Sequence, residues 1–185
     1  ASSTSVSGHP GSRTTSYIAQ GNTTDFTQSV KTDHWYNISG IDVIAPKKTG
    51  AVAILGNSIT DGRGSTTNQQ NRWPDILSKR LLANKKTRNV AVLNMGIGGN
   101  CVLRGGLGPT AMARYKRDLI DQAGVKWIIL FEAVNDLGGC RDGEQTANRI
   151  IDFYKQVIAE AHTKGIKVFG GTITPFKNNG YYSED

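Results

Sequence analysis

The chain has few of the residues that stabilise small disulfide-rich folds or span membranes. Its 185 residues include two cysteines, two methionines and three histidines. Two cysteines form at most one disulfide, which excludes a disulfide-rich scaffold. No stretch approaches the roughly 20 apolar residues of a transmembrane helix, and we expect no membrane span. With 37% hydrophobic residues, the chain can build one globular core of ordinary size.

Three glycine-based motifs are also missing. A P-loop would need a glycine and a lysine after Gly56, where the chain has Asp61 and no lysine. The hydrolase elbow Gly-x-Ser-x-Gly fails because Thr60 occupies the place of its second glycine. The stretch GIGGN (96–100) lacks the spacing of a dinucleotide fingerprint. Phosphate or nucleotide binding by these loops is therefore not expected.

The charge balance does not indicate a nucleic-acid partner. The sequence has 22 Lys and Arg against 15 Asp and Glu, a formal charge of +7, but the basic residues are scattered. We interpret the densest cluster, 79–88, as the solvated end of a helix rather than as a nucleic-acid patch. Zinc-finger spacing and the aromatic signature of RNA-binding domains are absent. We expect no nucleic-acid partner.

The first residues favour an exported protein. The chain begins with Ala1 rather than Met, and we expect that a signal peptide was removed or that the chain was truncated. Glycosylation sequons begin at Asn22 and Asn37, which predicts a secreted glycoprotein. Cys101 and Cys140 are either free buried thiols or one disulfide of an exported protein.

The pattern of apolar residues predicts two parts. Residues 1–46 read as a β-rich segment, with β-type runs at 14–19 and 34–45. In the second part, 47–185, apolar strands alternate with amphipathic helices, which predicts a three-layer α/β sandwich with a parallel sheet in the flavodoxin-like order 2-1-3-4. The predicted strands are 51–56, 90–95, 126–132 and 166–174, and the predicted helices are 72–86, 110–123 and 146–165.

Three strand ends carry polar and glycine residues suited to chemistry: 56–58, 94–100 and 132–136. In such sheets ligands bind beyond the carboxyl ends of the strands, where these loops would meet. Acyl transfer needs a nucleophile and donors around an oxyanion, which a serine, backbone N–H groups and an asparagine amide provide. Taken singly, the serine could be a helix cap, the glycine pair a tight turn and the asparagine an Asx turn.

These three stretches resemble blocks I, II and III of the SGNH hydrolases, also called the GDSL esterase/lipase family. GNSITDG resembles the first block with Asn57 in place of the usual aspartate. NMGIGGN resembles the second block, and AVND resembles the third with Ala133 in the glycine position. The stretches NRWPDIL and GGLGPTAMARYKRD are similar to a subfamily of secreted carbohydrate-active esterases. The resemblance covers 51 to about 175.

The resemblance implies a role for each matched residue. Ser58 would be the nucleophile, and its own N–H, the N–H of Gly99 and the side chain of Asn135 would form the oxyanion hole. Gly98 is the alternative to Gly99, one position away. The family also implies no metal and no organic cofactor. A disulfide between Cys101 and Cys140 would fasten the second loop to the third, and the alternative is that both simply pack.

The resemblance further implies a serine esterase that forms an acyl-serine intermediate. A small acyl group, such as acetyl, on a plant-type polysaccharide is the expected substrate, and a lipid or lysophospholipid is the second. Trp73, Tyr181 and Tyr182 could stack on sugar, although packing in the core or in a lid is their alternative fate. A non-catalytic carbohydrate-binding module and an acyltransferase that uses the same serine stay open.

The general base is missing from the sequence. The last family block is Asp-x-x-His, in which the histidine deprotonates the serine. The chain has no such motif, and we interpret His9, His34 and His162 as structural. We therefore expect 47–185 to be an SGNH hydrolase domain that is incomplete at its C-terminus. The missing Asp and His would lie on a C-terminal segment, deleted or present as a separate fragment of the same precursor. A relic that has lost the chemistry is the alternative.

Overall fold

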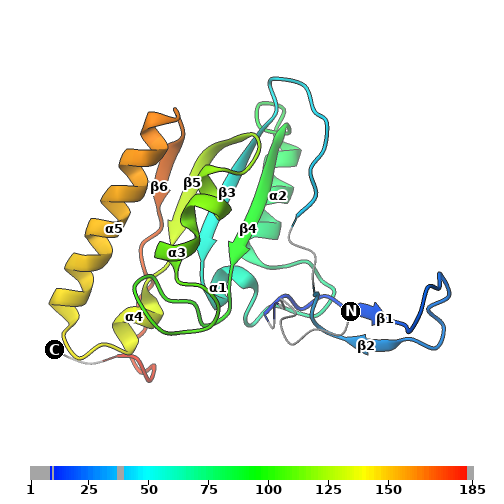
Figure 1. The fold of residues 1–185 in the computed structure, drawn as a ribbon, viewed down its shortest axis with the longest axis horizontal. Helices are drawn as coiled ribbons and strands as arrows, with labels where there is room; N and C mark the ends of the chain where they lie inside the picture. The colour runs from blue at the N-terminus through cyan, green and yellow to red at the C-terminus, as the bar shows by residue number, and fades with distance from the viewer. Residues whose placement is uncertain (1–8, 10, 37–39, 183–185) are drawn as a thin grey trace.

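A computed structural model of the chain describes residues 9, 11–36 and 40–182. Its main sheet has four parallel strands in the order β4-β3-β5-β6 (Figure 1). These strands are β3 (Gly50–Gly56), β4 (Val90–Gly96), β5 (Val125–Phe131) and β6 (Lys167–Gly170). The first strand of the sheet lies between the second and the third, which confirms the predicted flavodoxin-like order 2-1-3-4.

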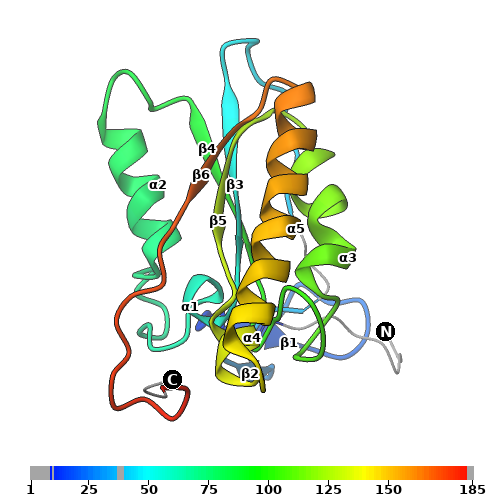
Figure 2. The same cartoon turned by 90° about the vertical axis from the view of Figure 1, so that its left-hand side faces the viewer.

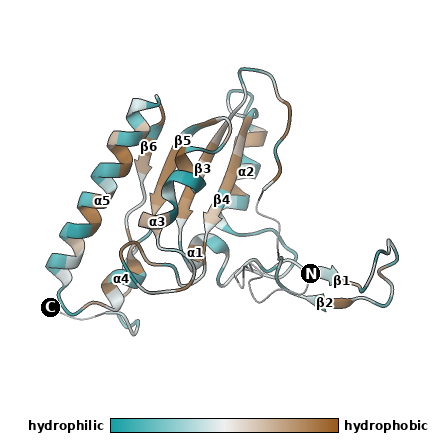
Figure 3. Cartoon of the chain, viewed as in Figure 1, coloured by the Kyte–Doolittle hydropathy of each residue, from teal (hydrophilic) through white to brown (hydrophobic). Residues whose placement is uncertain are grey.

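The register brings the carboxyl ends of the inner strands to one edge. Gly56 of β3 lies opposite Gly96 of β4 and Phe131 of β5. All of β3 is buried, as a central strand covered on both faces requires, and the strands are coloured as largely hydrophobic in Figure 3. The residues that follow β3, β4 and β5 must therefore lie close together.

Helices cover both faces of the sheet, and the predicted three-layer sandwich is confirmed (Figure 2). α2 (Trp73–Ala83) covers one face. The other face is covered by α5 (Gly143–Thr163) and by α3 (Ala111–Tyr115), which continues as a π-helical turn, Lys116–Ile120. Sequence analysis missed two short helices at the carboxyl edge, because four or five residues are too few to show helical periodicity. They are α1 (Ser58–Asp61) and α4 (Val134–Gly138).

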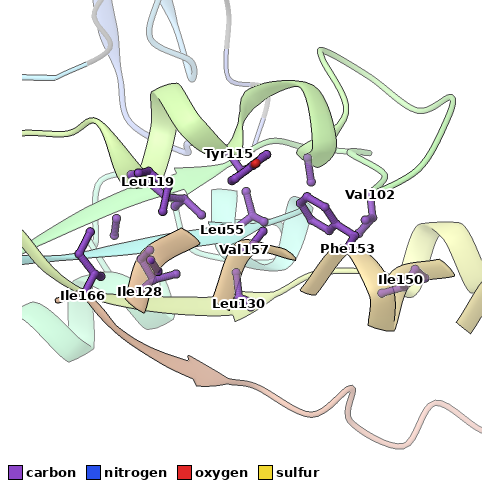
Figure 4. Packing of buried hydrophobic residues seen from close by; sticks show 14 of the residues in the cluster. Leu55, Val102, Tyr115, Leu119, Ile128, Leu130, Ile150, Phe153, Val157 and Ile166 are labelled. Carbon is purple, nitrogen blue, oxygen red and sulfur yellow. The ribbon is translucent and has the colours of Figure 1, made fainter. Parts of the chain in front are cut away.

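The hydrophobic core lies between the sheet and the α3–α5 layer. The buried side chains of α5 recur every three or four residues, as one helix face requires; they are Ile150, Phe153, Val157 and Ala161. They belong to one cluster with Leu55 of β3 and with Ile128 and Leu130 of β5 (Figure 4).

The N-terminal segment differs in part from the prediction. Within it, β1 (Ser16–Ile18) pairs antiparallel with β2 (Val30–Thr32), apart from the main sheet. The predicted strand over 34–45 is wrong for 40–45, which is irregular and exposes Ile44 fully. Apolar alternation makes a strand only where a partner strand is available, and none pairs with 40–45 among the described residues. The last strand of the main sheet also ends at Gly170 rather than 174.

Candidate active site

The turn after β3 presents Ser58 at the start of α1. The side chain of Asn57 caps this helix, since its Oδ1 accepts a hydrogen bond from the Ile59 N–H at 3.0 Å. A side chain at Gly56 would collide with Thr60. The cap is thus Asn57 rather than Ser58, and the interpretation of Ser58 as a cap is wrong. Among the described residues, the Ser58 hydroxyl makes no hydrogen bond.

Asp61 at the end of α1 joins this turn to two other segments. Its carboxylate is 2% exposed. One oxygen accepts hydrogen bonds from the N–H of Gly98 at 3.1 Å and of Gly11 at 3.2 Å. The other oxygen lies 3.4 Å from Nδ1 of His9. Asp61 therefore fixes the loop after β4 and the N-terminal segment against the nucleophile turn.

The loop after β4 is held by a buried amide. Gly99 has a φ of +69°, in the left-handed region that favours glycine. The next residue, Asn100, is fully buried, and its Nδ2 donates to the carbonyls of Leu107 at 2.9 Å and Pro109 at 2.8 Å. These two bonds hold the loop together, with Gly99 at its turn.

α4 is fastened to the same loop by both polar residues of the third block. Nδ2 of Asn135 donates to the carbonyl of Asn100 at 2.7 Å. The carboxylate of Asp136 accepts from the N–H groups of Val102 at 2.7 Å and Leu103 at 2.9 Å. Asn135 thus reaches across to the second loop rather than to its own backbone, so the Asx-turn interpretation is wrong.

Two backbone donors remain free in this arrangement. Among the described residues, the N–H groups of Ser58 and Gly99 donate no hydrogen bond. Asp61 links α1 to the loop after β4, and Asn135 links α4 to that loop. Free donors at such an edge are what an oxyanion hole requires. The assignment of Ser58, Gly99 and Asn135 to catalysis stays a prediction, as does the choice of Gly99 over Gly98.

Arg114 on α3 donates hydrogen bonds to the ends of β3 and β4. Sequence analysis did not identify this residue. It is 1% exposed. Its guanidinium donates to the carbonyls of Met95 at 2.6 Å and Gly56 at 3.2 Å, to Oδ1 of Asn100, and to the carboxylate of Asp118 at 3.0 Å. The only signal in the sequence was a lone arginine within the helical stretch TAMARY.

Ala133 occupies a strained position before α4. Its φ is +101°, it is 4% exposed, and it stands where the family pattern has glycine. A side chain in this region of φ costs of order 1–3 kcal/mol. The methyl group that distinguishes this chain from the family pattern is therefore a local energetic cost.

A cavity of about 460 Å³ opens beside Ser58. Its wall combines polar and aromatic side chains from the ends of β3 and β5 and from the segment after β6. The lining residues are Asn57, Ser58, Ile59, Arg63, Phe131, Glu132, Val134, Ile173, Thr174, Phe176, Asn179, Gly180 and Tyr181. Of the three predicted site residues, Ser58 lines the cavity, whereas Gly99 and Asn135 do not.

The aromatic residues singled out for sugar stacking have different environments. Tyr181 lines the cavity and is 46% exposed. Trp73 packs edge-on against Phe131, with ring centroids 6.0 Å apart, and its Nε1 donates to Oγ1 of Thr60 at 3.3 Å. Tyr182 packs on Phe176 at the same end of the chain. Trp73 thus has the packing role, and of these three residues Tyr181 is the one that lines the cavity.

Glu132 is an acidic group in this wall to which sequence analysis gave no role. Its side chain is 3% exposed. Burial raises its pKa to about 8, while Asn57 and the Arg114 guanidinium oppose the shift. Its signal in the sequence was an acidic residue at the end of the apolar strand KWIILFE.

Among the described residues, no histidine lines the cavity. The ring of His9 lies against Trp35, with centroids 5.9 Å apart. Nδ1 of His34 is buried without a partner among the residues described. His162 is exposed in the last turn of α5.

Both cysteines are free, so the proposed disulfide is wrong. Burial, Asp136 and Glu132 raise the pKa of Cys101 to about 11. Cys140 instead donates from its Sγ to the carbonyl of Leu137 at 3.0 Å. Hydrogen bonds from α4, rather than a covalent bond, therefore fasten the second loop to the third.

Two features are absent from residues 9, 11–36 and 40–182. No cluster of three or more His, Cys, Asp or Glu side chains there is arranged to hold a metal ion. No described helix combines the length and hydropathy that a membrane crossing requires.

Comparisons with known proteins bear on the family and the fold of the chain. The family model of the GDSL-like Lipase/Acylhydrolase family matches residues 54–185. No curated protein matches the chain. The solved structure of AlinE4, an SGNH-hydrolase family esterase, is similar with a TM-score of 0.52 and 16% identity, over 68% of this chain and 60% of that one. A Corynascus thermopiles (Myceliophthora fergusii) carbohydrate esterase family 2 enzyme with a carbohydrate-binding domain has a TM-score of 0.44 and 16% identity, over 77% and 50%.

Proposed function

Because the chain belongs to the GDSL-like Lipase/Acylhydrolase family, we propose that it hydrolyses carboxylic esters through an acyl intermediate on Ser58. One observation carries this proposal: Ser58 stands at the carboxyl end of the central strand and lines a cavity of about 460 Å³. The Ser58 hydroxyl makes no hydrogen bond with the described residues, so it is free to attack a substrate. Such a cavity is within the usual range for small ligands.

In the proposed reaction, Oγ of Ser58 attacks the acyl carbon and its proton passes to a base. The N–H groups of Ser58 and Gly99 and the amide of Asn135 would stabilise the oxyanion that forms. The C–O bond to the alcohol then breaks, and the alcohol leaves with the proton. Water repeats the sequence on the acyl-serine and releases the acid.

The base and its orienting acid are proposed to lie on a segment outside these 185 residues. The absence of histidine from the described cavity wall supports this proposal. The chain spans 60% of the AlinE4 structure. Mass spectrometry of the protein purified from its source should detect an Asp-x-x-His sequence, either continuous with the chain or as a fragment bound to it. If neither form of the Asp-x-x-His sequence is present and the protein has no esterase activity, the chain is a relic that has lost the chemistry.

For the substrate, we propose a short acyl ester, such as acetyl, on a polysaccharide outside the cell. The half-exposed ring of Tyr181 at the cavity supports this choice, because aromatic faces stack on sugars. Asn22 lies exposed in a loop, as a glycosylated asparagine of a secreted protein must. The second sequon, at Asn37, lies outside the described residues.

Kinetics of the intact protein test the proposal. Ser58→Ala should abolish turnover of p-nitrophenyl acetate, whereas Ser65→Ala should leave it unchanged. Ser65 is the matched control because it lies in the same loop and its hydroxyl bonds only to the carbonyl of Gly62. Equal rates for wild type and Ser58→Ala would reject the enzyme and favour a carbohydrate-binding module. Faster turnover of long-chain esters than of acetylated polysaccharide would favour the lipid alternative.

A further inference from the structure

The carboxylate of Asp61 lies between the N-terminal segment and the loop after β4, and it contacts both. It is 2% exposed. Its Oδ2 accepts hydrogen bonds from the N–H groups of Gly98 at 3.1 Å and Gly11 at 3.2 Å, and its Oδ1 lies 3.4 Å from Nδ1 of His9. Gly98 directly precedes Gly99, whose N–H is a predicted oxyanion donor. One buried carboxylate therefore connects the predicted oxyanion loop with a segment 50 residues before Asp61.

The N-terminal side of this contact is buried and closely fitted. Ser12 is 1% exposed, and its carbonyl accepts a hydrogen bond from Nη1 of Arg72 at 3.1 Å. The Arg72 guanidinium lies 5.0 Å from the centre of the Trp35 ring, and the Trp35 N–H donates to Oγ of Ser12 at 3.3 Å. Gly62, which follows Asp61, has no room for a side chain, because a Cβ there would collide with the carbonyl of Gly11. The N-terminal segment is thus packed against the nucleophile turn.

We infer that Asp61 is a positioning residue for the oxyanion hole and that the N-terminal segment is part of the catalytic unit. Gly11 supports the Asp61 carboxylate, the carboxylate holds the N–H of Gly98, and this bond fixes the loop that carries Gly99. The inference rests on the proposed function. It gives the N-terminal segment a role in turnover, because oxyanion stabilisation depends on donors held at the right distance and direction.

The inference predicts an effect on kcat rather than on KM. Asp61, Gly98 and Gly11 do not line the cavity beside Ser58. Changes at these residues therefore leave the contacts of the bound substrate in place. A loss that lowers kcat and kcat/KM equally is the sign of an interaction made only in the transition state.

The first test reaches Asp61 from the N-terminal segment. In Gly11→Ala the added methyl group would lie 2.7 Å from Oδ2 of Asp61 and must displace the carboxylate. We expect kcat for p-nitrophenyl acetate to fall at least tenfold, with KM within about twofold of wild type. Gly40→Ala is the matched control, because a methyl group there meets nothing within 4 Å. Equal kcat values for Gly11→Ala and Gly40→Ala contradict the inference.

The second test replaces Asp61 itself. Asp61→Asn keeps an oxygen that accepts from Gly98 and Gly11, and kcat should stay within about fivefold of wild type. Asp61→Ala removes the acceptor and should lower kcat at least tenfold. Urea unfolding verifies that each variant is folded under the assay conditions. Wild-type turnover in folded Asp61→Ala, or no recovery in Asp61→Asn, overturns the assignment.

A third measurement does not depend on activity. Hydrogen exchange of the Gly98 amide is followed by NMR in the intact protein. The amide should be protected in wild type and in Gly40→Ala, and should exchange at least tenfold faster in Gly11→Ala and Asp61→Ala, because its acceptor is displaced or lost. Equal exchange in Gly11→Ala and Gly40→Ala overturns the inference even if the protein is an active esterase. The expected exchange pattern in a wild type that hydrolyses no ester would contradict only the proposed function.

Discussion

Two regions of this molecule are equally buried and differently built: the layer between the sheet and α5, and the carboxyl edge of the sheet. The layer is apolar, and residues such as Leu55, Ile128 and Val157 are at most 2% exposed there. The edge is occupied by polar side chains that are at most 8% exposed. These are Asn57, Thr60, Asp61, Asn100, Arg114, Glu132 and Asp136.

The two regions contribute differently to the protein: the apolar layer mainly stabilises the fold, and the polar edge mainly fixes the geometry of the loops. Apolar burial is non-directional and stabilises the fold roughly in proportion to area. Hydrogen bonds contribute little net stability but fix direction, and an unsatisfied buried group is penalised. Asp61, Asn100 and Asp136 therefore force three loops into one arrangement. The layer should respond to mutation mainly in stability, and the edge mainly in turnover.

The largest expected effect lies in the layer. Phe153 is 3% exposed and packs edge-on against Tyr115, with ring centroids 5.5 Å apart. Phe153→Ala should lower the free energy of unfolding by about 3–5 kcal/mol, because it leaves a cavity. Urea unfolding measures the loss. Ile151→Ala, at a half-exposed position on the same helix, is the control. A loss below 1 kcal/mol would remove the contrast between the two regions.

At the edge, Asn135→Ala should lower turnover strongly and stability only slightly. If its amide stabilises the oxyanion, kcat should fall about 10²–10³-fold, or roughly 3 kcal/mol of transition-state stabilisation. Stability should fall by only about 1 kcal/mol, for the lost hydrogen bond to Asn100. Steady-state kinetics and urea unfolding of one preparation compare the two losses. A kcat near that of wild type would leave Asn135 a purely structural residue.

The stability of the two regions should also differ in its dependence on pH, because the edge includes a buried acid and the layer does not. The pKa of Glu132 is raised from 4.5 to about 8, so between these values the folded state binds a proton that the unfolded state has lost. The free energy of unfolding should therefore fall with rising pH, by up to about 1.4 kcal/mol per unit, and level off above pH 8. Glu132→Gln should remove this component, and Glu144→Gln should retain it. Equal slopes in wild type and Glu132→Gln would contradict the assignment.

The smallest expected effect is a gain in stability. Ala133→Gly should raise the free energy of unfolding by about 1 kcal/mol, because relief at φ +101° outweighs the entropy that glycine adds to the unfolded chain. Ala147→Gly within α5 should instead cost about 1 kcal/mol, because glycine is unfavourable in a helix interior. Thermal unfolding of the two variants should shift in opposite directions, and a loss in both would mean that the backbone at Ala133 is not strained.

Much of the fold followed from local pattern. The continuous apolar run in β3 and the spacing of Ile150, Phe153 and Val157 predicted the sheet and α5, since a buried strand and an amphipathic helix leave periodic traces. The short helices α1 and α4 were missed, the stretch 40–45 was predicted wrongly, and the state of the two cysteines was left open. Each depends on contacts with distant segments, which a local pattern does not record.

Local sequence patterns were enough to predict the order of the strands, the place of Ser58 at the end of the central strand, and the family to which its three loops belong. These depend on the hydrophobic period and on motifs read within a few residues. The folded structure was needed to show that Arg114 joins two strand ends, that Asn135 and Asp136 hold the second loop, and that Glu132 is buried in the wall of the cavity. Burial and hydrogen-bond partners come from residues far apart in the chain, and they exist only once the sheet has brought its ends together.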